Sequence, residues 1–110
     1  GRFYQLMCSL EAVNKFKIKF FDDALSFFEQ IPEIDRAKVS SSVKMMETDF
    51  DIVYTKLLKS PIRELIIKKY RLLFFIKKDT IYFVSGFIKK TQKTPLQEIQ
   101  KAENVYKMMK

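Results

Sequence analysis

Residues Tyr70–Ile88 read YRLLFFIKKDTIYFVSGFI, and the architecture of the chain can be worked out from them. Tyr70–Ile76 is apolar apart from Arg71, and Thr80–Ile88 is again rich in β-branched and aromatic residues. The polar residues 77–79 separate the two runs and are typical of a turn. We expect two antiparallel strands here. The first should be a central strand covered on both sides, because it is apolar on both of its faces.

Arg71 is the exception in this predicted central strand. An unpaired charge among buried neighbours is costly, so the guanidinium needs a partner. It could pair with Glu64 on the adjacent strand, or it could project from the sheet to bind a phosphate, for which its planar fork is suited. The spacing leaves both interpretations open.

Two further strands are expected on the N-terminal side. Ile62–Ile67 is a short β-branched run that begins just after Pro61. Lys15–Phe20 reads KFKIKF, and this strict alternation is typical of a half-buried strand whose lysines face water. Consecutive runs with short connections predict antiparallel neighbours.

Two helices are expected between those strands. Asp22 is the candidate N-cap of the first helix, which Pro32 ends. The second begins near Glu33 or Ile34 and has helical apolar spacing. Its predicted buried face is Val39, Val43, Met46 and Phe50. A connection this short predicts an antiparallel helical hairpin.

The C-terminal part reads GFIKKTQKTP over residues 86–95 and then becomes helical. Thr94 as N-cap, Pro95 as the first helical residue and Gln97 two residues later predict a capping box. The expected buried stripe of this helix is Leu96, Ile99, Ala102, Tyr106 and Met109.

The predicted order is therefore β-α-α-β-β-β-α. It corresponds to an α+β fold with a small antiparallel sheet, helices on one side of it, an N-terminal helical hairpin and a C-terminal helix. Residues 15–110 form the one expected domain. Residues 1–14 are an N-terminal extension in which Phe3, Leu6, Met7 and Leu10 have the spacing of a short helix.

Composition excludes several classes of function. The chain has no histidine, one cysteine and two glycines. It therefore lacks the ligands of a zinc site, the base of a histidine-dependent triad and a glycine-rich phosphate loop, and we expect no cofactor. No apolar run reaches the roughly 20 residues that span a bilayer. The lone Cys8 fits a reducing cytoplasm, which is the expected location.

The charge is distributed unevenly. The net charge is +8, and residues 1–60 contribute nothing to it because nine basic residues balance nine acidic ones. Residues 61–110 hold twelve basic and four acidic residues, including Lys89, Lys90 and Lys93 close together. This asymmetry indicates a polyanionic partner, with nucleic acid favoured over an acidic protein or a membrane surface.

Specific motifs accompany this charge. The chain from residue 15 to 110 resembles the HigB-like, phage-derived branch of the RelE/ParE superfamily of type II toxins. The strongest match is GFIKKTQKTP at 86–95, followed by a helix. Supporting matches are EL at 64–65 with YRLLF at 70–74, and FFDDA at 20–24.

This resemblance implies a ribosome-dependent endoribonuclease that cuts mRNA and inhibits translation. It implies a cognate antitoxin, often of helix-turn-helix type, through which the toxin–antitoxin complex would bind DNA, and no membrane partner. The catalytic residues that it implies are Arg71, Lys89 and Lys90. The expected RNA-binding residues are Arg63, Lys68, Lys69, Tyr70 and Lys93.

Two departures from the branch keep other functions open. Ile66 stands where the branch usually has Arg, and Ser85 stands where it often has His. A ParE-like toxin that inhibits DNA gyrase by binding alone would need no catalytic residue. A degenerate homologue would keep only antitoxin or nucleic-acid binding.

Overall fold

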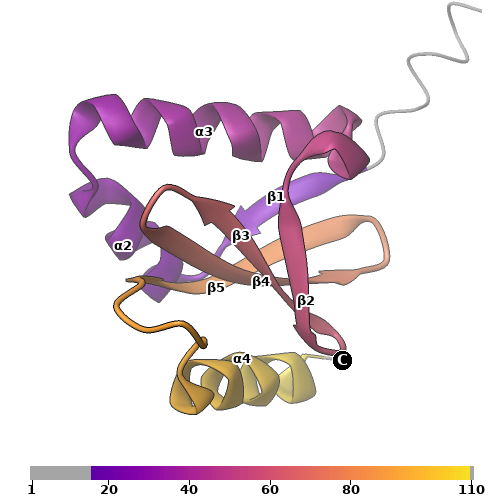
Figure 1. Cartoon of the computed structure of the whole chain (residues 1–110). Helices are drawn as coiled ribbons and strands as arrows, with labels where there is room; N and C mark the ends of the chain where they lie inside the picture. The colour runs from indigo at the N-terminus through magenta and orange to yellow at the C-terminus, as the bar shows by residue number, and fades with distance from the viewer. Residues whose placement is uncertain (1–15, 110) are drawn as a thin grey trace, which may run out of the picture.

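The computed structural model describes residues 16–109, and it forms an α+β fold (Figure 1). The predicted helix within residues 1–14 lies outside the described residues. The elements in chain order are β1 (Lys17–Phe20), α2 (Asp22–Gln30), α3 (Glu33–Thr48), the 3-10 turn η1 (Phe50–Ile52), β2 (Thr55–Lys59), β3 (Ile62–Ile67), β4 (Tyr70–Lys77), β5 (Thr80–Ile88) and α4 (Leu96–Met108).

The sheet has five strands in the order β1-β5-β4-β3-β2. Strands β2 to β5 are antiparallel neighbours, and β4 lies at the centre as predicted. The expectation of a purely antiparallel sheet was wrong, because β1 pairs with β5 in parallel. The chain between β1 and β5 contains two helices and three strands, so it is long enough for the crossover that a parallel pair requires.

One strand was missed in the sequence. Thr55–Lys59 reads TKLLK, with neither a continuous apolar run nor strict alternation. It forms an edge strand that pairs only with β3, through a register shift between Leu57 and Lys59. An edge strand has one neighbour and is often irregular, so its sequence carries a weak signal.

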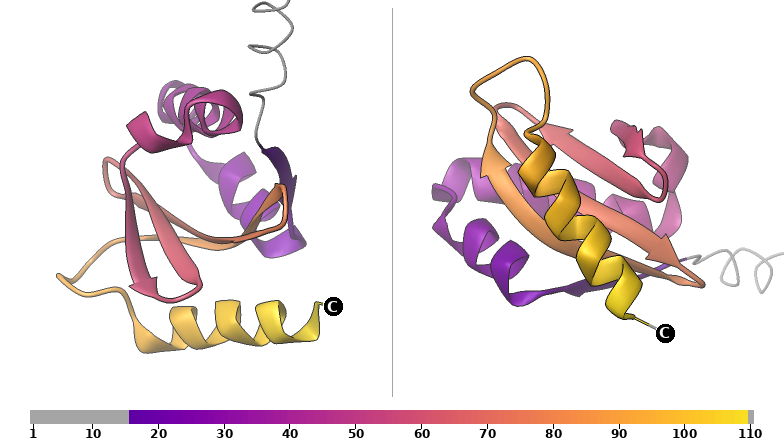
Figure 2. Two further views of the ribbon diagram at one scale, coloured as in Figure 1. Left: turned by 90° about the vertical axis from the view of Figure 1, so that its right-hand side faces the viewer. Right: turned by 90° about the horizontal axis from the view of Figure 1, so that it is seen from below.

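The helices cover both faces of the sheet (Figures 1 and 2). Helices α2 and α3 lie on one face and α4 crosses the other, so the expectation of helices on one side was wrong. Each face has its own apolar core: Tyr70, Leu72 and Phe74 point toward α2 and α3, and Leu73 and Phe75 point toward α4. The alternation along β4 therefore explains why this strand is apolar at nearly every position.

Both predicted helix caps were wrong. Helix α2 already begins at Asp22, with Phe21 in the cap position, and α4 begins at Leu96 after Pro95. Neither start has a side-chain cap hydrogen bond, and the Thr94 hydroxyl is used elsewhere. In the predicted stripe of α4, Ala102 is buried but Leu96 is 82% exposed.

Candidate nucleic-acid interface

Two rows of side chains cross the sheet on the α4 side, close to the N-terminal end of that helix. Residues directly opposite one another in neighbouring strands share a face. The register aligns Lys56 with Glu64, Glu64 with Leu73, and Leu73 with Ser85. In the next row Ile66 lies opposite Arg71, and Arg71 lies opposite Phe87.

Arg71 is half-buried and is anchored to the backbone. Its Nη1 donates to the carbonyl oxygen of Lys68 at 2.7 Å and to that of Tyr70 at 3.0 Å. The predicted alternative of an ion pair with Glu64 is not found among the described ion pairs. The Arg71 Nε is buried without a partner in the described part of the chain. Because the described hydrogen bonds use only Nη1, the guanidinium retains other N–H groups that can donate to an anion on the α4 side of the sheet.

Glu64 is a fully buried carboxyl beneath the segment that follows β5. The Thr94 hydroxyl donates to its Oε2 at 2.5 Å, and its Oε1 has no described partner. In the same row, the Ser85 hydroxyl donates to Oε1 of Glu98 in α4 at 3.4 Å. These contacts hold the start of α4 against β3 and β5.

The segment between β5 and α4 carries the clustered lysines and is held at both ends by hydrogen bonds to the sheet and its β3–β4 turn. The backbone amide of Lys89 donates to the carbonyl of Lys69 in the β3–β4 turn at 2.8 Å, and Thr94 is bonded to Glu64. Lys90 and Lys93 are exposed between these two attachments. The lysine cluster therefore lies at the same end of the sheet as Arg71.

Replacing Thr94 tests this attachment. Thr94→Val keeps the shape of the side chain but leaves the Glu64 carboxyl buried without its donor, so we expect a loss of about 1.5–3 kcal/mol in the free energy of unfolding. Urea denaturation measures it. Thr94→Ser should retain most of the stability. Equal stabilities for the Val variant and the wild type would contradict the anchoring role.

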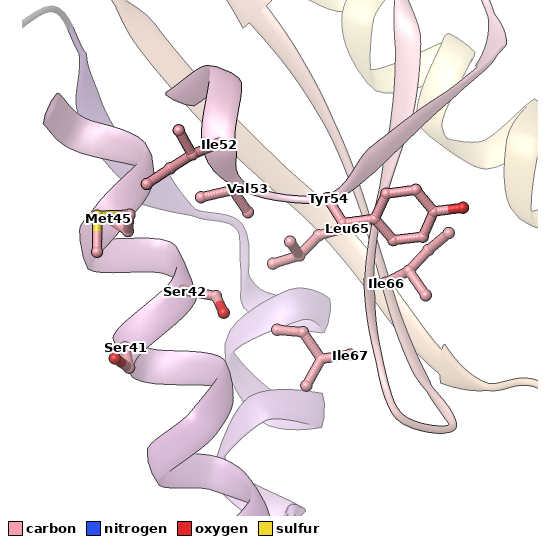
Figure 3. A pocket seen from close by; sticks show the side chains of 9 residues that line it. All are labelled: Ser41, Ser42, Met45, Ile52, Val53, Tyr54, Leu65, Ile66 and Ile67. Carbon is pink, nitrogen blue, oxygen red and sulfur yellow. The ribbon is translucent and has the colours of Figure 1, made fainter. Parts of the chain in front are cut away.

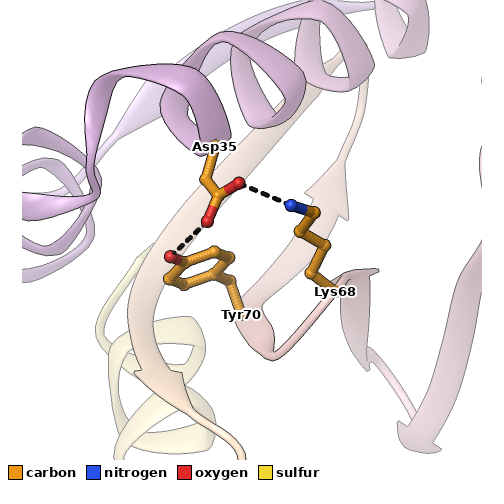
Figure 4. Close-up of polar contacts among 3 residues, drawn as sticks. All are labelled: Asp35, Lys68 and Tyr70. Atoms are coloured by element: carbon orange, nitrogen blue, oxygen red, sulfur yellow. Dashed lines mark hydrogen bonds and ion pairs between the residues drawn. The ribbon is translucent and has the colours of Figure 1, made fainter.

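Two predicted RNA-binding residues are engaged on the opposite face (Figure 4). Lys68 Nζ lies 2.8 Å from Oδ1 of Asp35, and the buried Tyr70 hydroxyl donates to Oδ2 of the same carboxylate at 2.7 Å. The hydrogen bonds from Lys68 and Tyr70 lower the pKa of Asp35. The hydrogen bond to Asp35 raises the pKa of both Lys68 and Tyr70. This triad joins α3 to the β3–β4 hairpin.

The Asp35 triad predicts a pH dependence of stability. The folded-state pKa of Asp35 is depressed, so its contribution is present above its unfolded pKa near 4 and is lost as pH falls through the lower folded value. Asp35→Asn should therefore destabilise the protein at pH 7, and the difference from wild type should shrink below pH 4. Urea denaturation from pH 2.5 to 7 measures this. A pH-independent difference would contradict it.

Arg63 also lies away from Arg71. Its Nη2 donates to Oγ1 of Thr55 at 3.3 Å, and its guanidinium carbon is 5.8 Å from the centre of the Phe50 ring. It is aligned with Phe74, whose side chain belongs to the core beneath α2 and α3.

The structure thus brings together only part of the predicted set. Arg71, Lys89, Lys90 and Lys93 share one end of the sheet. Arg63, Lys68 and Tyr70 make contacts on the other face, where the Lys69 Nζ also lies 5.7 Å from the centre of the Tyr70 ring. Lys56 also lies on the α4 side and was missed, because the strand that carries it was not recognised.

Among the described residues, no group of three His, Cys, Asp or Glu side chains could hold a metal ion. No described helix combines the length and apolarity needed to cross a membrane.

Several solved structures share this fold. A mutant of the Escherichia coli toxin RelE in the free state has a TM-score of 0.64 at 15% identity, over 86% of this chain and 99% of that one. The archaeal RelE–RelB complex from Pyrococcus horikoshii gives 0.58 at 10% identity, over 67% and 94%. The YoeB dimer from Staphylococcus aureus gives 0.52 at 18% identity, over 70% and 98%.

The sequence itself identifies the family. None of the curated proteins matches it significantly. Residues 26–107, however, match the family described as phage derived protein Gp49-like (DUF891), and this range runs from α2 to the last turn of α4. It includes β4, the lysine-rich segment and the start of α4. The chain therefore belongs to the Gp49-like family of phage-derived proteins and has the RelE-like fold.

Proposed function

We propose that this protein is the toxin of a type II toxin–antitoxin system and acts as a ribosome-dependent mRNA endoribonuclease. The observation that carries the proposal is the position of Arg71 beside the lysine-rich segment at one end of the sheet. Family membership and the RelE-like fold support the toxin assignment. The net charge of +8 favours a polyanionic substrate.

The proposed reaction is attack by an RNA 2′-hydroxyl on the adjacent phosphorus. The O2′–P bond forms as the P–O5′ bond breaks, leaving a 2′,3′-cyclic phosphate and a 5′-hydroxyl. Negative charge on the pentavalent phosphorus needs a fixed cation, and Arg71 is placed to supply it. Lys89 and Lys90 would bind neighbouring phosphates, with Lys93 at the rim.

The site has few side chains that could transfer protons during this reaction. The chain has no histidine, so one of the clustered lysines is the candidate that takes the 2′-hydroxyl proton or protonates the leaving 5′-oxygen. So sparse a set of groups suits an enzyme that acts on mRNA already positioned by the ribosome, which would place its action in the cytoplasm.

The proposed protein partner is a cognate antitoxin. RelE proteins from Pyrococcus horikoshii, Mycobacterium tuberculosis and Methanococcus jannaschii were crystallised in complexes with antitoxins. For the present chain we expect an antitoxin of helix-turn-helix type, through which the complex would bind DNA. Acidic antitoxin segments would be attracted by the basic half of the toxin.

Induced expression in a bacterial host tests the proposal. The wild type should arrest growth and produce new 5′-hydroxyl ends within translated messages. Co-expression of the antitoxin should suppress both effects. The double variant Lys89→Ala/Lys90→Ala should cut far less while keeping an unfolding midpoint close to the wild type, because neither side chain forms a described hydrogen bond or ion pair and Lys90 is exposed.

Other outcomes point to the alternative functions. Growth arrest with intact transcripts would overturn mRNA cleavage and direct the work to DNA gyrase. No arrest, with the folded protein still bound by its antitoxin, would identify a degenerate toxin whose departures at Ile66 and Ser85 have removed activity.

A further inference from the structure

Tyr54 is a large aromatic residue left exposed at the start of the edge strand. It is 69% exposed and immediately precedes β2. It also borders a pocket of about 280 Å³, whose other walls come from α3, η1 and β3. Figure 3 shows the Tyr54 ring and Ile66 on one side of β3, whereas Leu65 and Ile67 lie on the other side, toward α3. The ring therefore lies on the same side of the sheet as Arg71.

The register places this ring in the row that contains Arg71. The backbone amide of Ile66 donates to the carbonyl of Tyr54 at 3.5 Å, so the two residues are cross-strand neighbours. Ile66 lies opposite Arg71, which lies opposite Phe87. Adjacent strands are about 5 Å apart, so Tyr54 and Arg71 are separated by about 10 Å across the sheet. A nucleotide, or two neighbouring nucleotides, can bridge this separation.

The charges beside Tyr54 favour RNA over an apolar partner. Lys56 is two residues further along and therefore on the same side of the sheet, where it is exposed. Arg71 is the other solvent-accessible charge of these rows, while the carboxyl of Glu64 is fully buried. A flat exposed ring near two cations is an arrangement by which proteins bind single-stranded nucleic acid, with stacked bases and neutralised phosphates.

We propose that Tyr54 is a stacking platform for an unpaired base of the RNA whose phosphate Arg71 binds, an assignment that rests on the ribonuclease function proposed above. Ile66 widens the platform on the side toward Arg71. Lys56 binds a flanking phosphate. Because stacking tolerates every base, Tyr54 contributes affinity and positioning and selects weakly for sequence.

The chain contains no tryptophan, so Tyr54→Trp introduces a single indole reporter. This variant should bind a short single-stranded RNA at low salt as tightly as the wild type, and its fluorescence should be quenched as the base stacks. Tyr54→Phe should also bind normally. Tyr54→Ala should weaken binding about ten-fold, measured by fluorescence anisotropy of the labelled oligomer.

Two controls isolate stacking. An oligomer of equal length with abasic sites should bind the wild type and Tyr54→Ala equally, because no base remains to stack. Leu57→Ala removes a 52% exposed apolar side chain from β2, aligned with Arg63 on the opposite face, and should leave RNA binding unchanged.

Several outcomes would overturn the assignment. One is that Tyr54→Ala binds RNA as tightly as the wild type while Arg71→Ala binds weakly. This result would exclude the stacking platform but would not contradict the proposed ribonuclease function. Another is an equal loss on normal and abasic oligomers. A third is loss of antitoxin binding alone, which would make Tyr54 part of a protein-docking surface. If the wild type fails to bind the oligomer, or Arg71→Ala binds as tightly as the wild type, the RNA-binding function falls together with the platform.

Discussion

Arg71→Ala is expected to lower the rate of the proposed mRNA cleavage on the ribosome by at least about 100-fold, the usual effect of removing one preorganised group that stabilises transition-state charge. Arg71 lies in the central strand, and its Nη1 is bonded to two backbone carbonyls. The cation is therefore already oriented before substrate arrives. Single-turnover cleavage of a defined message in a purified translation system measures the loss.

The Arg71 experiment needs a control for charge and one for folding. Arg71→Lys keeps the positive charge but loses the planar fork, so it should restore only part of the rate. Unfolding midpoints of both variants should lie close to the wild type, since Arg71 is only half-buried, forms no described ion pair and donates only to backbone carbonyls near the solvent. Full activity of a folded Arg71→Ala protein would exclude Arg71 from catalysis and favour a toxin that acts by binding alone.

Phe74→Ala is expected to lower the free energy of unfolding by about 3–5 kcal/mol, the cost of a large cavity in a core. Phe74 is fully buried in the centre of β4 and contacts the rings of Phe50 and Phe83, with centroids 6.1 and 5.3 Å away. Domains of this size are stable by only about 5–15 kcal/mol, so the variant should be close to unfolding at 37 °C.

Urea denaturation followed by circular dichroism measures this loss. Phe74→Leu keeps much of the buried volume and should cost about 1–2 kcal/mol. Leu57→Ala, at an exposed edge position, should change stability by less than about 1 kcal/mol and serves as the surface control. A loss below about 1 kcal/mol for Phe74→Ala would mean that this core relaxes around the cavity or is loosely packed.

The strands that form the middle of the sheet could be predicted almost residue by residue. Ile62–Ile67 and Thr80–Ile88 occur as predicted, and Tyr70–Lys77 extends the prediction by one residue. Two-residue turns join them, so their pairing depends on neighbouring sequence. Thr55–Lys59 was missed, because its strand conformation depends on pairing with a neighbour already in place rather than on its own pattern.

The candidate site was predicted less well, for a geometrical reason. Tyr70 and Arg71 are adjacent in sequence, and both were assigned to RNA, but successive residues of a strand point to opposite faces. Tyr70 is consequently bonded to Asp35 in the core beneath α3, whereas Arg71 lies on the α4 side. Asp35 carries no signal in its local sequence that would reveal this contact.

The sequence alone determined the α+β class, the central position of β4, the basic character of the C-terminal half and the likeness to a toxin family. These follow from local patterns, composition and short motifs. Only the tertiary structure decided which face each charged residue occupies, that α4 covers the face opposite α2 and α3, and that Thr94 binds Glu64 rather than capping a helix. Such choices depend on strand register and on contacts between residues far apart in the chain, which a local pattern cannot specify.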